Sequence, residues 1–121
     1  MTDLEDVPCE ESRARLGDGV ADIVRDADHT RIVLEGDIDV HSVARLRPFV
    51  ESECDRNAQT VVLDLTAVEF VDSHGLHLVA ETHRRLANDG RSLVVVPAPS
   101  AAWRAFVVTG LDHVLVVEPD A

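Results

Sequence analysis

The 121-residue sequence has no lysine and no tyrosine, and aromatic side chains make up only 3% of it. Without lysine, neither a lysine-dependent phosphate-binding loop nor Schiff-base catalysis is available. The few aromatic rings cannot build the stacking surface on which proteins bind single-stranded nucleic acid. Since 45% of the residues are nevertheless apolar, the core is expected to consist mainly of valine, leucine and alanine.

Basic residues are also scarce: 11 arginines stand against 23 acidic residues, and the formal net charge is −12. This charge repels phosphate backbones and anionic lipid, so nucleic acids and membrane surfaces are poor partners. No apolar run reaches membrane-spanning length, and the first residues lack the pattern of a secretory signal. Cys9 and Cys54 have no spacing typical of a disulfide framework or a zinc site. We therefore expect a soluble, cytoplasmic protein.

The length of the chain predicts one domain, large enough to bury roughly two-thirds of its unfolded surface. Residues 1–17 carry five acidic side chains and few large apolar ones. This composition predicts a mobile acidic tail, with at most a short helical turn near Ser12 to Leu16. The folded domain is then expected to span residues 18–121.

Hydrophobic periodicity predicts a mixed α/β fold. Residues 20–25 and 31–35 alternate in polarity around a short polar loop, which is typical of an antiparallel hairpin. Helices and strands are then expected to alternate over residues 41–56, 60–65, 73–88, 93–96, 101–109 and 114–117. Crossover helices of this length connect parallel strands. Because strands 31–35 and 60–65 each have one partly polar face, the helices should lie mainly on one side of the sheet.

The stretch 61–76 predicts a buried strand, a short acidic turn and a corner that begins a helix. Ser73 is expected to be the N-cap residue, which stabilises a helix by about 1 kcal/mol. At this positive end of the helix, a phosphate on Ser73 could accept hydrogen bonds from free backbone N–H groups. Gly75 has no side chain and lets another backbone approach closely. The pattern alone favours a simple cap at least as much as a phosphorylation site.

Catalytic interpretations of this corner fail on geometry. Asp72, Ser73 and His74 are the residue types of a hydrolase triad, but three consecutive residues at a helix start point in different directions. Val71 stands where the nucleophile elbow of hydrolases needs a glycine. His74 and His77 are three residues apart, which is a weak signal for a metal. We therefore predict no enzymatic activity, no metal and no cofactor or tightly bound small molecule.

Several segments resemble the STAS domain of the anti-sigma factor antagonist family. The resemblance is carried by LDL at 63–65, VEFVDSHGL at 68–76, GDID at 36–39, HRR at 83–85, LVVV at 93–96 and TGLD at 109–112. These segments occur in the family's order and cover roughly residues 18–118. The resemblance implies a single-domain STAS-like fold over residues 18–121.

The resemblance also implies a bacterial partner-switching protein that controls sigma-factor-dependent transcription in a stress response. In such a protein, the serine that matches Ser73 is phosphorylated by an anti-sigma factor that is also a serine kinase. The unphosphorylated form binds this kinase and frees a sigma factor; phosphorylation releases the antagonist, and a PP2C-type phosphatase restores it. Asp39 and Asp72 match the acidic residues beside the acceptor. The implied partner-binding residues are Asp37, Asp39, Asp72, His74, Gly75 and Leu76.

His74 departs from the family pattern, because many members have a second serine there. A histidine beside a phosphoserine could neutralise part of its charge and make the switch pH-sensitive. An alternative with the same fold is the soluble STAS subunit of a lipid- or solute-transport ATPase complex, although such subunits often lack the serine. A nucleotide-binding or stressosome-type sensor is disfavoured because no second domain is attached.

Overall fold

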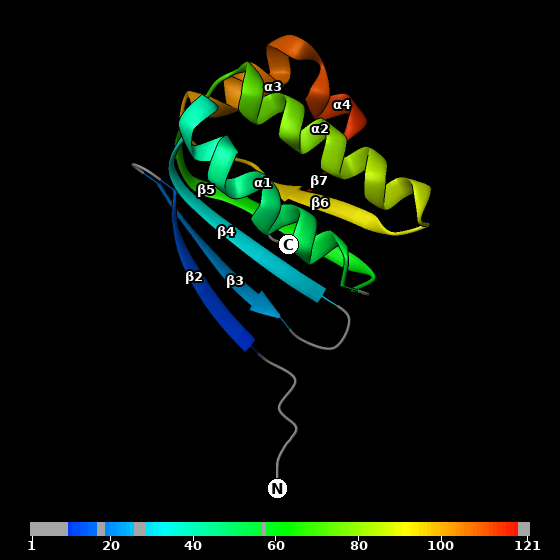
Figure 1. The fold of residues 1–121 in the computed structure, drawn as a ribbon. Helices are drawn as coiled ribbons and strands as arrows, with labels where there is room; N and C mark the ends of the chain where they lie inside the picture. The colour runs from blue at the N-terminus through cyan, green and yellow to red at the C-terminus, as the bar shows by residue number, and fades with distance from the viewer. Residues whose placement is uncertain (1–9, 17–18, 26–28, 57, 119–121) are drawn as a thin grey trace, which may run out of the picture.

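The computed structural model describes residues 10–16, 19–25, 29–56 and 58–118 (Figure 1). In this part of the chain, six strands form one sheet in the order β2-β3-β4-β5-β6-β7. The strands are β2 (Glu10–Leu16), β3 (Gly19–Arg25), β4 (His29–Ile38), β5 (Thr60–Val71), β6 (Ser92–Val96) and β7 (Val116–Val117). The helices are α1 (Val40–Cys54), α2 (Ser73–Asn88), α3 (Ala102–Thr109) and α4 (Leu111–Val114).

The sheet is mixed, as the sequence predicts. β2, β3 and β4 pair antiparallel, whereas β4, β5, β6 and β7 pair parallel. α1 connects β4 to β5, α2 connects β5 to β6, and α3 with α4 connects β6 to β7. The predicted hairpin is the β3–β4 pair, and the predicted order of alternating helices and strands is confirmed.

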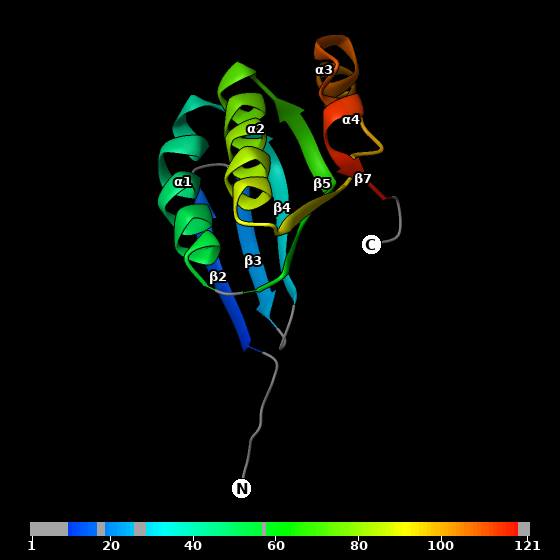
Figure 2. The same ribbon diagram turned by 90° about the vertical axis from the view of Figure 1, so that its right-hand side faces the viewer.

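The main core lies between the sheet and the α1–α2 pair, which lie side by side on one face (Figure 2). α3 and α4 lie apart from this pair, beyond β5. Phe106 of α3 is fully buried in the same core. A separate small cluster of Val62, Val94 and Val96 is buried on β5 and β6. None of the helices in the described segments is long and apolar enough to cross a membrane.

The mobile tail predicted over residues 1–17 extends too far into the folded domain. The segment Glu10–Leu16 is not a helical turn but a strand, paired with β3 from Glu10 opposite Arg25 to Leu16 opposite Gly19. Its partner strand supplies backbone hydrogen bonds that do not depend on apolar side chains. Residues 1–9 lie outside the described part of the chain.

The acidic turn predicted after residue 65 is also wrong, because β5 continues to Val71. Its pairing with β4 shifts register twice, between Val33 and Glu35 and between Gly36 and Asp37. At the first shift, Asp64 accepts hydrogen bonds from the Thr66 amide at 2.9 Å and the Thr66 hydroxyl at 2.7 Å. β-Bulges of this kind accommodate polar residues that otherwise indicate a turn.

The C-terminal strand is shorter than predicted. Gly110 ends α3 with φ of 79°, as expected for a glycine after a helix. The chain then forms the single-turn helix α4 over Leu111–Val114, where the sequence predicts a turn leading into a strand from residue 114. Leu111 packs against the core, which anchors this turn and leaves only Val116–Val117 to pair with β6.

Candidate functional site

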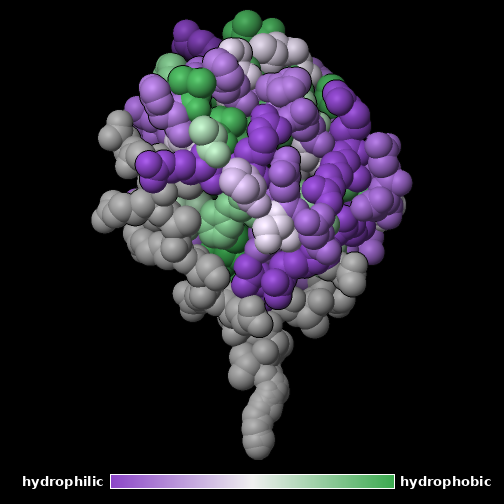
Figure 3. All heavy atoms as spheres, in the orientation of Figure 1, coloured by the Kyte–Doolittle hydropathy of each residue, from purple (hydrophilic) through white to green (hydrophobic). Residues whose placement is uncertain are grey.

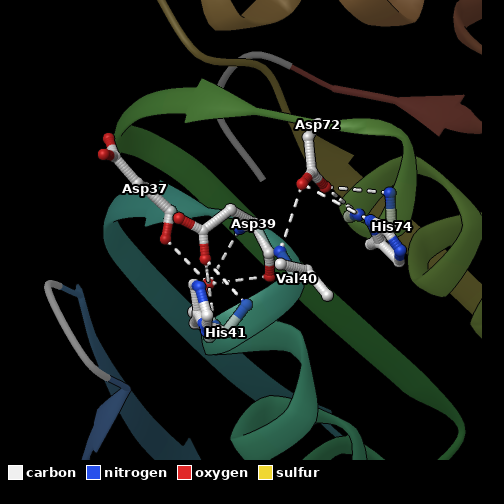
Figure 4. A network of polar contacts seen from close by, with 8 residues as sticks. Asp37, Asp39, Val40, His41, Asp72 and His74 are labelled. Carbon is white, nitrogen blue, oxygen red and sulfur yellow. Dashed lines mark hydrogen bonds and ion pairs between the residues drawn. The ribbon is translucent and has the colours of Figure 1, made fainter.

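Two strand-to-helix corners lie next to each other in the sheet. β4 and β5 run parallel, and their last residues, Ile38 and Val71, are paired. A single residue separates each strand from its helix: Asp39 before α1 and Asp72 before α2. Both aspartates have extended backbones and act as N-caps (Figure 4). The fold therefore brings together the two acidic residues that the sequence predicts beside Ser73.

The Asp39 corner is closed by a capping box. The Asp39 carboxylate accepts from the amides of His41 at 3.0 Å and Ser42 at 3.1 Å. In return, the Ser42 hydroxyl accepts from the Asp39 amide at 2.8 Å and donates to the Asp37 carbonyl at 2.9 Å. Ser42 is only 2% exposed. The hydrogen bond from the Ser42 amide is the largest of the effects that lower the pKa of Asp39 below its ordinary value.

The Asp72 corner has a different set of contacts. One Asp72 carboxylate oxygen accepts from the amides of His74 at 2.8 Å and Gly75 at 3.1 Å. The other oxygen accepts from the amide of Val40 at 3.1 Å and so joins the two corners (Figure 4). The Asp72 amide donates to the carbonyl of Ile38 at 3.1 Å. This backbone contact continues the β4–β5 pairing and keeps Asp72 extended.

Asp72, and not Ser73, is therefore the N-cap of α2, which corrects the sequence prediction. Ser73 is the first helical residue and is exposed. In the described part of the chain, its hydroxyl has no hydrogen-bond partner. The N–H groups of His74 and Gly75, expected to be free for a phosphate, are already bound by Asp72.

Gly75 is buried at the start of α2, beside the last residues of β4 and β5. A Cβ atom at this position would lie 2.9 Å from Ile38 Cγ2, 2.9 Å from Val71 Cγ1 and 3.0 Å from the Ile38 carbonyl oxygen. The close backbone approach expected for Gly75 is thus present. A buried glycine offers no surface to a partner, so Gly75 contributes packing. Leu76 is half-buried and also packs against the core.

The outer face of α2 carries a series of polar contacts. His74 Nδ1 lies 3.5 Å from Asp72 Oδ2, and the His74 side chain is 56% exposed. One turn further along α2, His77 Nε2 lies 3.3 Å from Glu81 Oε2. Arg47 of α1 contacts the other oxygen of Glu81 at 2.5 Å. His74 and His77 therefore face different carboxylates, and the described residues contain no group of three or more metal-ligating side chains.

Two exposed apolar side chains beside the corners are missed by the sequence analysis. Val40 is 46% exposed directly after Asp39, and Phe70 is 51% exposed and paired with Asp37 at the end of β4. Hydrophobic residues on the helical face gather mostly toward the end where α1 and α2 begin, and the rest of this face is mainly hydrophilic (Figure 3). In the sequence, Val40 could have been identified because it is an apolar residue directly after the acidic segment Asp37–Asp39, where a strand ends and a helix begins.

Comparison with protein families gives a match over most of the chain. The family model described as "Mlab, STAS domain" matches residues 21–118. The chain therefore belongs to the STAS domain family, and the predicted fold class is confirmed.

Individual relatives within this family are anti-sigma factor antagonists. An anti-sigma-B factor antagonist from Listeria monocytogenes is 27% identical over 94 residues, which cover 78% of this chain and 82% of that protein. The anti-sigma-F factor antagonist RsfB from Mycobacterium tuberculosis is 32% identical over 89 residues, covering 71% and 72%. The crystal structure of an anti-sigma factor antagonist from Mycobacterium paratuberculosis superposes with a TM-score of 0.73 at 25% identity and covers 84% of this chain and 86% of that one.

Proposed function

We propose that this protein is an anti-sigma factor antagonist that binds an anti-sigma factor while Ser73 is unphosphorylated and is released when Ser73 is phosphorylated. The observation that carries the proposal is the exposed Ser73 hydroxyl on the first residue of α2, directly after the acidic cap Asp72. The names of the relatives support the same role. The protein acts by binding and not by catalysis, and it controls sigma-factor-dependent transcription.

The partner surface is proposed to surround the two corners. It includes the carboxylates of Asp37, Asp39 and Asp72 with the exposed side chains of Val40 and His74. A partner that fits this surface presents hydrogen-bond donors or basic groups to the acidic caps and an apolar contact to Val40. The exposed Phe70 extends the same surface along the end of β5.

Phosphorylation would change this surface by its charge. A phosphate carries close to two negative charges at neutral pH. On Ser73 it adds these charges beside Asp72, which already uses both carboxylate oxygens to hold α1 and α2. The added charge is costly to desolvate in an interface and disfavours the apolar contact that the partner makes at Val40. The switch needs no refolding of the domain, because the caps themselves stay in place.

The proposed cycle has two partner enzymes. The anti-sigma factor is itself the serine kinase that phosphorylates Ser73, and a PP2C-type phosphatase removes the phosphate. Labelled ATP and candidate anti-sigma kinases, followed by phosphosite mapping, test the first step. The expected result is one labelled site at Ser73, and the Ser73→Ala variant should stay unlabelled. Efficient labelling of Ser73→Ala would contradict the assignment of the acceptor.

Binding measurements test the switch itself. Ser73→Asp is expected to weaken binding to the cognate anti-sigma factor about 100-fold, whereas Ser73→Ala binds like wild type; this loss corresponds to a few kcal/mol. Ser92→Asp is the matched control, since it adds the same charge at an exposed serine at the start of β6. Calorimetry with the purified partner measures all three affinities. If Ser73→Asp and Ser73→Ala both bind like wild type, Ser73 is not the switch.

The alternative is a soluble STAS subunit of a lipid- or solute-transport ATPase complex. The description of the matching family model leaves this role open within the STAS domain family. Affinity purification from the native cells separates the two functions. A stable complex with a transport ATPase that is unchanged by Ser73→Asp favours the transport role.

A further inference from the structure

A phosphate on Ser73 would find few hydrogen-bond donors on its own helix terminus. Asp72 already binds the amides of His74 and Gly75, and the Leu76 amide donates to the Asp72 carbonyl at 3.0 Å. The phosphate therefore needs a donor other than these first-turn amides, or it must displace the Asp72 cap. A cationic side chain on the same face of α2 would meet this need.

His77 is the side chain of α2 that is placed to provide such a cation. It follows Ser73 by four residues within α2, and side chains four residues apart share one helix face with Cβ atoms about 5–6 Å apart. Helical side chains generally lean toward the N-terminus, so a change of rotamer away from Glu81 can bring the His77 ring toward Ser73. The His77 side chain is 66% exposed and can change rotamer. His74 follows Ser73 directly, and adjacent residues do not face each other on a helix.

His77 can move away from Glu81 without leaving the Glu81 carboxylate unpaired, because Arg47 also contacts it. Its Nε2 atom lies 3.3 Å from Glu81, but Glu81 is also held by Arg47 at 2.5 Å. The hydrogen bond from Arg47 is the main cause that lowers the pKa of Glu81. The charged groups around His77 are then Glu81 and His74 on its own helix and Arg47 from α1. A phosphate dianion offers His77 more negative charge than a carboxylate that is already paired.

We propose that His77 is the intramolecular cation that binds a phosphate on Ser73 and makes the charge of the phosphorylated corner depend on pH. This inference rests on the proposed phosphorylation of Ser73. The second ionisation of phosphoserine has a pKa near 6, and histidine side chains change charge between about pH 5 and 8. A protonated imidazole favours the phosphate dianion, and the dianion favours the protonated imidazole. A protonated His77 offsets part of the phosphate charge that would have to be desolvated when the partner binds.

The test is a ³¹P NMR titration of the full chain with phosphoserine genetically encoded at position 73. In His77→Gln, the second ionisation of the phosphate is expected at a pH about 0.3 unit higher than in the otherwise wild-type phosphoprotein, the size of an exposed i,i+4 pair. His74→Gln is the matched control and should keep the wild-type midpoint. An unchanged midpoint in His77→Gln overturns the proposal, and so does an equal shift in His74→Gln.

The result of the NMR titration can be distinguished from the result of the kinase assay that tests the proposed function. Encoding the phosphoserine bypasses the kinase, so the titration reports only on the contact between His77 and the phosphate. A kinase assay that leaves Ser73 unlabelled contradicts the proposed function, whatever the titration gives. Labelling of Ser73 without a midpoint shift in His77→Gln contradicts only the role of His77.

Discussion

The two strand-to-helix corners of this domain share one design but differ at the first and third helical residues, which are Val40 and Ser42 at one corner and Ser73 and Gly75 at the other. In each, a strand of the parallel pair ends, one extended aspartate caps the next helix, and the helix begins at once. The third helical residue is Ser42 at the first corner and Gly75 at the second. Ser42 closes its corner with a reciprocal hydrogen bond, whereas Gly75 cannot.

This difference separates a closed corner from the corner that carries the proposed phosphorylation site. The Ser42 hydroxyl is buried and bound to backbone groups of Asp37 and Asp39, so no enzyme can reach it. The Ser73 hydroxyl is exposed, and the Asp72 carboxylate uses its second oxygen to hold the Val40 amide of the other corner. Ser73, at the first helical position, is therefore exposed, whereas Ser42, at the third, is used by its own cap.

The largest effect on stability is expected from Gly75→Ala. The added methyl group would contact Ile38 and Val71 at 2.9 Å, and it would crowd the Ile38 carbonyl that pairs with the Asp72 amide. Overpacking of this kind costs typically 1–3 kcal/mol, partly offset by the better helix propensity of alanine. We expect a loss of about 2 kcal/mol in the free energy of unfolding. Urea denaturation measures it, and a variant as stable as wild type would show that the approach of α2 to β4 is not tight.

A smaller effect is expected from Ser42→Ala, with Ser73→Ala as its matched control. Removing the buried hydroxyl opens the capping box and leaves the Asp39 amide and the Asp37 carbonyl without their partner. We expect a loss of about 1 kcal/mol in the free energy of unfolding. Ser73→Ala removes an exposed hydroxyl and should change stability by less than about 0.5 kcal/mol. Equal losses in the two variants would remove the distinction between the corners.

The smallest effect is a pH dependence at the Asp39 corner. Hydrogen bonds, first of all that from the Ser42 amide, hold the pKa of Asp39 below its ordinary value of 3.8. A carboxyl with a lowered folded pKa contributes stability that is complete above pH 3.8 and is lost as the pH falls through the folded pKa. Asp39→Asn should therefore be less stable than wild type at neutral pH, with a difference that shrinks below pH 3.8. Urea denaturation at a series of pH values gives this comparison, and a constant difference down to pH 2 would argue against it.

The sequence predicts the parts of the fold that depend on local patterns. The bounds of α2, the hairpin of β3 and β4 and the glycine at the end of α3 are set by periodicity and turn chemistry within a few residues. β2 is missed because a strand at the edge is held by backbone pairing with β3, and its polar composition resembles that of a tail. The continuation of β5 is missed because its bulges depend on the register with β4, which is not a local property.

The candidate site is predictable in its members but not in its geometry. The resemblance to anti-sigma factor antagonists identifies Asp39, Asp72 and Ser73 together. The sequence cannot choose between Asp72 and Ser73 as the cap, because both residue types are good N-caps. The choice is made by the hydrogen bond from the Asp72 amide to Ile38 on the neighbouring strand, which keeps Asp72 extended and leaves Ser73 to begin the helix.

The two-residue strand β7 covers β6 at one end of the sheet. β6 is apolar over Leu93–Val96, has high β-propensity and carries no charge, which is the composition of an aggregation-prone strand when it stands at an open edge. Val116 and Val117 pair with Val94 and Val95, and the Glu118 amide donates to the Val95 carbonyl at 3.0 Å. Because of this short cover, the apolar β6 does not stand at an open edge of the sheet; the opposite edge is β2, whose sequence is mainly polar.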